Sequence, residues 1–182
     1  MITRFLSAMA LFLLLLTTIT AQNNTIDFDN PTLAYTVTST HMGVAYGCEI
    51  DNRCLVASAG RGDAPQRVMI TISFPQVVEI RNVRVDYMLT ITGTPPLYTG
   101  GVWNAQVTGG NNRFDGTVRI NLPYDGVWHT VSTQDNTPRT RYWQAHAPYV
   151  GNKLRIEFNP ASHIHSGTEI RIDNIVIDYV EL

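Results

Sequence analysis

Val68-Met-Ile-Thr-Ile-Ser-Phe74 decides the fold class, because its side chains alternate between two faces of an extended chain. The apolar members share one face: Val68, Ile70, Ile72 and Phe74. An apolar period of two is typical of a strand with one side in a core. The same alternation recurs at 83–91, 118–122 and 154–158. Each of these segments is therefore expected to be a half-buried strand.

Turn-forming sequences separate these segments, and no stretch of the mature chain shows a sustained helical period of apolar residues. The expected turns are Gly93-Thr-Pro-Pro96, Gly109-Gly-Asn-Asn112, Tyr124-Asp-Gly126, Asn136-Thr-Pro138 and Asn159-Pro160. Strands that follow one another without intervening helices pair antiparallel. The sequence therefore predicts an all-β fold, an antiparallel two-sheet β-sandwich of jelly-roll type.

The last segment, Glu169 to Leu182, changes phase in its middle. Ile170 and Ile172 alternate, Asp173-Asn174 interrupts, and the apolar residues then resume one position out of step. One extra residue in a strand produces this shift. We expect a β-bulge at Asp173-Asn174.

The first 21 residues have the layout of a cleavable signal peptide. Arg4 precedes an apolar run from Ala8 to Leu16, and small residues lead to Ala21. The run is shorter than the roughly 18 to 20 residues that span a bilayer, so no stable membrane insertion is expected after cleavage. Residues 1–21 are thus predicted to be a signal peptide and 22–182 a single secreted β-sandwich domain.

Charge and cysteine content narrow the class further. The chain has 13 Lys plus Arg and 15 Asp plus Glu, a net charge of −2, so no nucleic-acid partner is expected. The only two cysteines, Cys48 and Cys54, are close in sequence. In an exported chain they are expected to form a local disulfide, worth roughly 2 kcal/mol by loop entropy.

Both ends of the mature chain resemble a known group of domains. Thr25-Ile-Asp-Phe-Asp-Asn30 and Arg171-Ile-Asp-Asn-Ile-Val-Ile-Asp-Tyr-Val-Glu-Leu182 resemble the bracketing strands of jelly-roll carbohydrate-binding modules and galactose-binding-like domains. Asp125-Gly-Val-Trp-His-Thr-Val-Ser132 resembles the strand with a tryptophan that such modules carry late in the domain. The resemblance implies a structural Ca²⁺ held by Asp29 and Asp173. Alternatively, Asp29 caps a turn and Asp173 occupies the bulge.

Carbohydrate binding uses aromatic rings against the apolar face of a sugar and polar side chains for its hydroxyls. Two groups of residues that we expect in loops combine aromatic rings with polar side chains. The predicted ligand-binding residues are Tyr98, Trp103 and Gln106 in the first group and Tyr142, Trp143 and Gln144 in the second. Trp128 follows a turn and is expected to be a core or sheet-covering residue instead.

The sequence contains no recognisable catalytic motif, neither Gly-x-Ser-x-Gly nor His-Glu-x-x-His. We therefore expect a secreted, non-catalytic binding protein with a glycan or polysaccharide as its partner. A structural or adhesive protein that docks another protein is the alternative. A jelly-roll glycoside hydrolase is a third possible function. It would need two carboxylates close together, drawn from Asp115, Asp125, Asp135 and Glu157.

Overall fold

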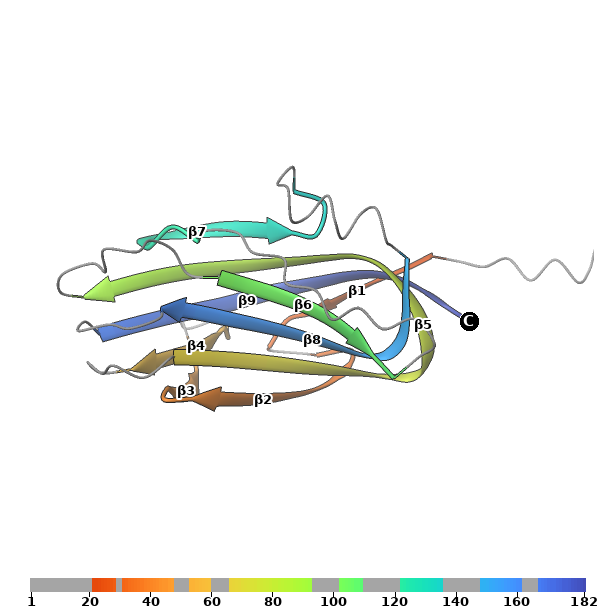
Figure 1. Cartoon of the computed structure of the whole chain (residues 1–182), viewed down its shortest axis with the longest axis horizontal. Helices are drawn as coiled ribbons and strands as arrows, with labels where there is room; N and C mark the ends of the chain where they lie inside the picture. The colour runs from red at the N-terminus through yellow and green to blue at the C-terminus, as the bar shows by residue number, and fades with distance from the viewer. Residues whose placement is uncertain are drawn as a thin grey trace, which may run out of the picture.

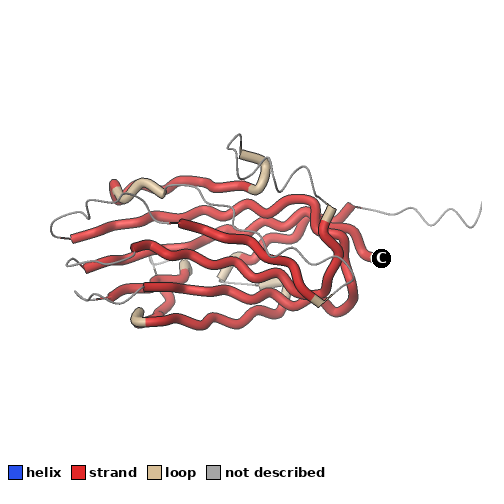
Figure 2. The backbone as a smooth tube through the Cα atoms, in the orientation of Figure 1, coloured by secondary structure: helices blue, strands red, loops and turns tan. Residues whose placement is uncertain are grey.

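The computed structural model describes residues 21–28, 31–47, 53–59, 66–92, 102–109, 122–135, 148–161 and 167–182. Every regular element in these ranges is a β-strand (Figures 1 and 2). The strands are β1 (Ala21–Ile26), β2 (Ala34–Thr40), β3 (Gly43–Tyr46), β4 (Leu55–Ala59), β5 (Gln66–Thr92), β6 (Val102–Thr108), β7 (Asp125–Ser132), β8 (Tyr149–Ala161) and β9 (Gly167–Glu181). The all-β prediction is confirmed. These ranges contain no helix long and apolar enough to cross a membrane.

Strand β5 belongs to both layers of a β-sandwich. Its 27 residues curve from one layer into the other (Figure 1), and the side chains of Pro75, Gln76 and Val77 are exposed at the bend. Hydrogen bonding consequently runs through all nine strands without a break. All the pairings are antiparallel, as predicted.

The first layer has the order β2–β5–β8–β6 and uses the first half of β5. Tyr35 pairs with Ile72, which pairs with Leu154, which pairs with Val107. Residues paired in this way share a face of the sheet, so these four point into the sandwich. The polar residues between them point outward.

The second layer has the order β3–β4–β9–β5–β7 and uses the second half of β5. Strand β1 pairs with β9 from Ile175 to Val180, beyond the part of β9 that pairs with β4. The first and last described strands are therefore neighbours.

The core fills the space between the layers. Ring contacts join them: Phe158 lies 6.1 Å from Tyr87, and Phe74 lies 5.0 Å from Tyr179, between ring centroids. The apolar side chains of Val68, Ile70 and Ile72 are fully buried. At about 25 cal/mol per Å² of apolar surface, this burial is the main force that holds the layers together.

The predicted bulge in the last strand is confirmed. Arg84 pairs with Val176 but Asp86 pairs with Asp173, so β9 holds one extra residue there. Asn174 has φ 44°, a left-handed conformation that asparagine tolerates.

Two strand and turn predictions are corrected. Segments 68–74 and 83–91 form one bent strand, and Asn159-Pro160, expected as a turn, lies inside β8. The pairing register of β8 with β5 slips at this point, between Gln66 and Val68, so a proline that donates no hydrogen bond is accommodated. Most of the segment at 118–122 lies outside the described residues.

Candidate functional site

The structure places Trp103 in the core, and its prediction as a sugar-stacking residue is wrong. Its side chain is 0% exposed and its ring is stacked on Phe158 at 6.3 Å. Trp103, Ala105 and Val107 alternate along β6 and all point inward. A ring that solvent cannot reach offers no surface to a ligand.

Trp128 is exposed instead, contrary to the expectation that it covers or enters the core. It is 41% exposed on β7, an edge strand of the second layer, where it pairs with Met88. Its neighbour Val127 is 56% exposed. Trp128 therefore does not enter the core, whereas Trp103 does.

Of the other predicted binding residues, the structure describes Gln106 alone. It lies on the outward side of β6, beside Arg155 of β8. Tyr98, Tyr142, Trp143 and Gln144 lie outside the described residues, so their predicted role stays a prediction. Tyr98 precedes β6 in the chain, whereas the other three precede β8.

We define the outer polar face as the outward side of the first layer. Its described side chains come from all four strands and, apart from Ala34 and Met69, carry hydrogen-bonding or charged groups. They are Ala34, Thr36, Thr38 and Thr40 of β2, Arg67, Met69, Thr71 and Ser73 of β5, Lys153, Arg155, Glu157 and Asn159 of β8, and Asn104, Gln106 and Thr108 of β6.

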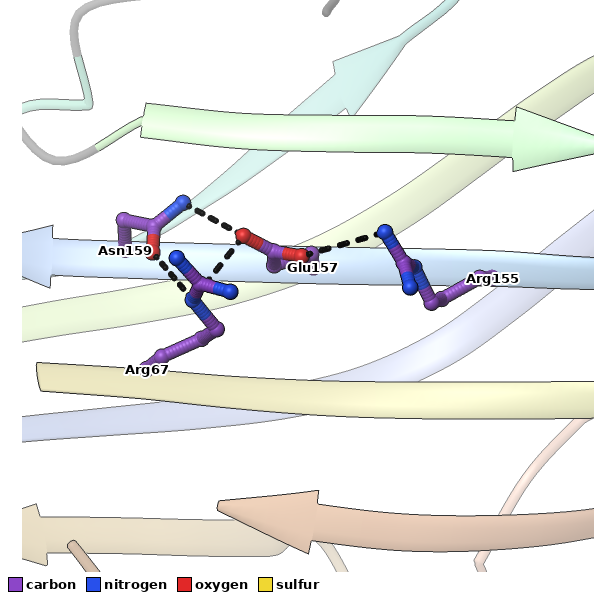
Figure 3. Close-up of polar contacts among 4 residues, drawn as sticks. All are labelled: Arg67, Arg155, Glu157 and Asn159. Carbon is purple, nitrogen blue, oxygen red and sulfur yellow. Dashed lines mark hydrogen bonds and ion pairs between the residues drawn. The ribbon is translucent and has the colours of Figure 1, made fainter. Parts of the chain in front are cut away.

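A polar network fixes the centre of this face (Figure 3). Arg67 Nε lies 3.1 Å from Glu157 Oε1, and Asn159 Nδ2 donates to the same oxygen at 3.0 Å. Arg67 Nε also donates to Asn159 Oδ1 at 3.2 Å, which closes a triangle. On the other side, Arg155 Nη2 lies 3.7 Å from Glu157 Oε2.

The Glu157 carboxylate is almost enclosed by these partners. The residue is only 6% exposed although it points away from the core. Charge-assisted hydrogen bonds of this kind compensate the loss of hydration. The network therefore holds the Arg67 guanidinium and the Asn159 amide in fixed positions on a solvent-facing sheet, with Arg155 as a looser ion-pair partner.

Two polar atoms beside the network make no hydrogen bond with any described residue. Asn104 Oδ1 and Arg155 Nε are both buried and have no partner. Asn104 pairs with Glu157 across β6 and β8, so it adjoins the network. Buried polar atoms are normally satisfied, and an unsatisfied pair of one acceptor and one donor is unusual.

The sequence pattern that indicates the core also indicates part of this face. The alternation that places Leu154, Ile156 and Phe158 inward also places Arg155, Glu157 and Asn159 together on the opposite side. No local pattern, however, indicates that Arg67 of β5 joins them.

A second polar cluster lies at the edge of the second layer. His129 Nε2 lies 3.0 Å from both oxygens of Asp125, and its ring stacks on Tyr87 at 5.7 Å. The hydrogen bond with His129 lowers the pKa of the Asp125 carboxyl. Asp125 and Glu157 belong to different layers, so these two carboxylates do not form the close pair that a glycoside hydrolase needs.

The predicted calcium ligands are only partly described, because Asp29 lies outside the described residues. Asp173 is buried at the bulge, and its Oδ1 accepts a hydrogen bond from the backbone N–H of Asn174. Ile26, at the end of β1, pairs with Ile175. In the described ranges, no three His, Cys, Asp or Glu side chains form a group that could hold a metal. A Ca²⁺ here therefore depends on Asp29 and on backbone oxygens to complete its six to eight ligands.

The structure describes only one cysteine of the predicted disulfide, Cys54. Cys54 is buried and is not a free thiol, and it lies directly before β4. The backbone N–H of Gly47 donates to the carbonyl oxygen of Cys54 at 3.0 Å, which closes the loop that follows β3. Cys48 lies outside the described residues, so the pairing stays a prediction.

Comparisons with known proteins match the fold to several solved structures. No family model matches the chain, and neither does any curated protein sequence. The family 11 carbohydrate-binding module from Clostridium thermocellum, solved with a β-1,3-1,4-mixed-linked tetrasaccharide, is 14% identical, with a TM-score of 0.47 over 85% of this chain and 94% of the module. The module TmCBM61, solved with β-1,4-galactotriose, is 10% identical, with a TM-score of 0.43 over 84% of this chain and 93% of the module.

An enzyme domain is also similar. The enzymatically active domain of tailspike protein 4 from bacteriophage CBA120 is 17% identical, with a TM-score of 0.49 over 84% of this chain. This chain spans only 20% of that domain's length. The chain is thus similar to β-sandwich carbohydrate-binding modules and to an enzyme domain, and identities and TM-scores this low assign no ligand to it.

Proposed function

We propose that this protein binds a carbohydrate through the outer polar face. The observation that carries the proposal is the Arg67–Glu157–Asn159 network, which fixes guanidinium and amide groups on an outward-facing sheet. Sugar hydroxyls need donors and acceptors at set positions, and side chains that are already held lose little freedom on binding. Strands position such groups more rigidly than loops do.

The predicted aromatic residues complete this proposal. Tyr98 leads into β6, and Tyr142 and Trp143 lead into β8, the two strands that form one side of the outer polar face. An aromatic ring at the margin of a polar sheet would supply the apolar contact that the described part of the face lacks.

A glycan is favoured over a protein partner by the distribution of exposed apolar side chains. Among the described residues these lie at three separate places: Val44 and Tyr46 on β3, Val127 and Trp128 on β7, and Val77 and Leu182 near the bend. Strands β3 and β7 are opposite edges of the second layer. Protein-binding surfaces are normally contiguous apolar patches.

The test is a glycan array followed by calorimetry with three variants. Gln106→Ala and Trp143→Ala should each weaken binding at least about tenfold if they remove a polar contact and a stacking contact worth about 1.4 kcal/mol or more. Trp128→Ala, in the second layer, is the matched control and should bind as the wild type does. Absence of wild-type binding to every glycan would refute the proposal.

We further propose that the protein is exported and that residues 1–21 are removed. Ala21 is the first residue of β1 and pairs with Val180, so cleavage after it leaves the remainder of the strand intact. N-terminal sequencing of the protein from the culture medium tests this, and an N-terminus other than Gln22 would contradict the cleavage position.

Calcium binding by Asp29 and Asp173 also remains a proposal. Bound Ca²⁺ stabilises the folded state by mass action, so a chelator should lower the melting temperature. Asp29→Asn should remove this difference. An identical midpoint with and without chelator would contradict a structural calcium.

A further inference from the structure

The outer polar face carries an excess of positive charge. Its described ionisable side chains are Arg67, Lys153 and Arg155 against the single carboxylate of Glu157, a surplus of two positive charges. The whole chain has a net charge of −2. The surplus is therefore a local feature of this face and opposes the charge of the molecule.

The outward side of the second layer has the opposite balance. On β5 and β9 this side carries five carboxylates and three guanidinium groups. These are Glu79, Asp86, Glu169, Asp173 and Asp178 with Arg81, Arg84 and Arg171. A general property of the surface would affect both faces alike, so the cations of the outer polar face are a distinct arrangement.

The cations keep unused binding capacity after they have neutralised Glu157. Arg67 contacts both Glu157 and Asn159 through Nε, and its terminal Nη groups make no hydrogen bond within the described part of the chain. Arg155 Nη2 is 3.7 Å from the carboxylate, beyond hydrogen-bonding distance, and the Arg155 side chain is 43% exposed. Lys153 is exposed and makes no ion pair or hydrogen bond within the described residues.

We propose that the glycan bound by the outer polar face is anionic, carrying carboxylate or sulfate groups. This inference rests on the proposed carbohydrate-binding function and specifies its ligand class. Glu157 holds Arg67 through its Nε, and the Arg67 side chain is 46% exposed, so its guanidinium is accessible to a planar oxyanion, the matching ligand. Lys153 and Ser73 pair across β8 and β5 and extend the cationic row toward the bend.

The number of cations favours an acidic saccharide over a nucleic acid. Proteins that bind nucleic acid through its backbone typically neutralise about 6 to 10 phosphates. The described part of this face offers three cations, interleaved with neutral hydroxyl and amide side chains. A sparse array of charges among hydrogen-bonding groups suits a polymer that has both hydroxyls and occasional anions.

The test compares polymers that differ only in charge. Polygalacturonate is matched with its carboxyl-reduced galactan, and dextran sulfate with dextran, in affinity electrophoresis and calorimetry on the full chain. We expect at least one acidic polymer to bind about tenfold more tightly than its neutral partner, and the preference to shrink as added salt screens the charges. The two pairs distinguish carboxylate from sulfate recognition.

Matched variants locate the effect. Lys153→Gln should weaken binding of the acidic polymer about two- to fivefold, the range of one exposed ion pair. Arg84→Gln removes the same charge from an exposed position of the second layer that has no side-chain partner among the described residues, and it should bind as the wild type does. Circular dichroism checks that both variants fold.

Each outcome decides one of the two proposals. Equal binding of charged and neutral polymers would overturn the anionic ligand class and leave carbohydrate binding intact. Equal weakening by both variants would show a nonspecific charge effect and would also overturn it, as would binding of single-stranded DNA as tight as that of the acidic polymer. Failure to bind any glycan would overturn the proposed function itself.

Discussion

Replacing Trp103 separates a core role from a binding role. Trp103 is fully buried and stacked on Phe158, so Trp103→Ala leaves a large cavity that should cost about 3 to 5 kcal/mol of the free energy of unfolding. Its Nε1 donor has no acceptor among the residues that the structure describes. Trp103→Phe removes this donor, a gain of about 1 to 3 kcal/mol. The smaller hole costs about 1 to 2 kcal/mol, and the two effects should nearly cancel.

Urea unfolding followed by far-ultraviolet circular dichroism measures both variants without relying on tryptophan fluorescence. With a slope of about 2 kcal/mol per M, Trp103→Ala should lower the midpoint by about 1.5 to 2.5 M. Trp128→Ala is the control; because Trp128 is 41% exposed, it should cost less than about 1 kcal/mol. Equal effects of the two alanine variants, or a Trp103→Phe variant as unstable as Trp103→Ala, would refute the reasoning.

Three further perturbations test other parts of the structure. Burial of the Tyr35 phenol, aided by its hydrogen bond with Tyr46, raises its pKa to about 12. The unfolded state therefore loses this proton from about pH 10, while the folded state retains it. The free energy of unfolding should fall from pH 10 to 12, and Tyr35→Phe should reduce that fall in thermal melts. Gly151→Ala would bring a Cβ to 2.5 Å from the Thr108 carbonyl oxygen and 2.8 Å from Val107 Cγ1. The clash should lower the free energy of unfolding by about 1 to 3 kcal/mol, measured in urea. An unchanged midpoint would contradict the close approach of β6 and β8. Reduction of the predicted Cys48–Cys54 bond should lower the free energy of unfolding by roughly 2 kcal/mol. Reduction should be slow while the protein is folded, because Cys54 is fully buried. Two free thiols found by mass spectrometry before reduction would contradict the bond.

The sequence was sufficient for features that depend on local periodicity. Alternation in Val68–Phe74 and Leu154–Phe158 identified the inward faces of β5 and β8, and a change of phase located the bulge of β9. These features need only the rule that neighbouring side chains of a strand point to opposite sides.

Features that depend on pairing between distant segments were missed. Gly100-Gly101 before Trp103 suggested a loop, although Trp103, Ala105 and Val107 alternate as a strand. Residues 75–77 look like a connection between two strands, and only pairing with β8 and β9 shows that they bend one. Likewise, Arg67 meets Glu157 only because β5 and β8 are neighbours, which no local pattern encodes.

The pairing of β1 with β9 has a consequence for how the chain acquires its structure. Ala21 and Ile26 find their partners at Val180 and Ile175, close to the other end of the sequence. A ribosome adds about 5 to 20 residues per second, so β1 waits for several seconds until its partner strand has been made. Such high contact order is associated with slow folding. The pairing of β1 therefore forms only after β9 has been made, and an emerging chain exposes Ile26 to solvent or to a chaperone until then.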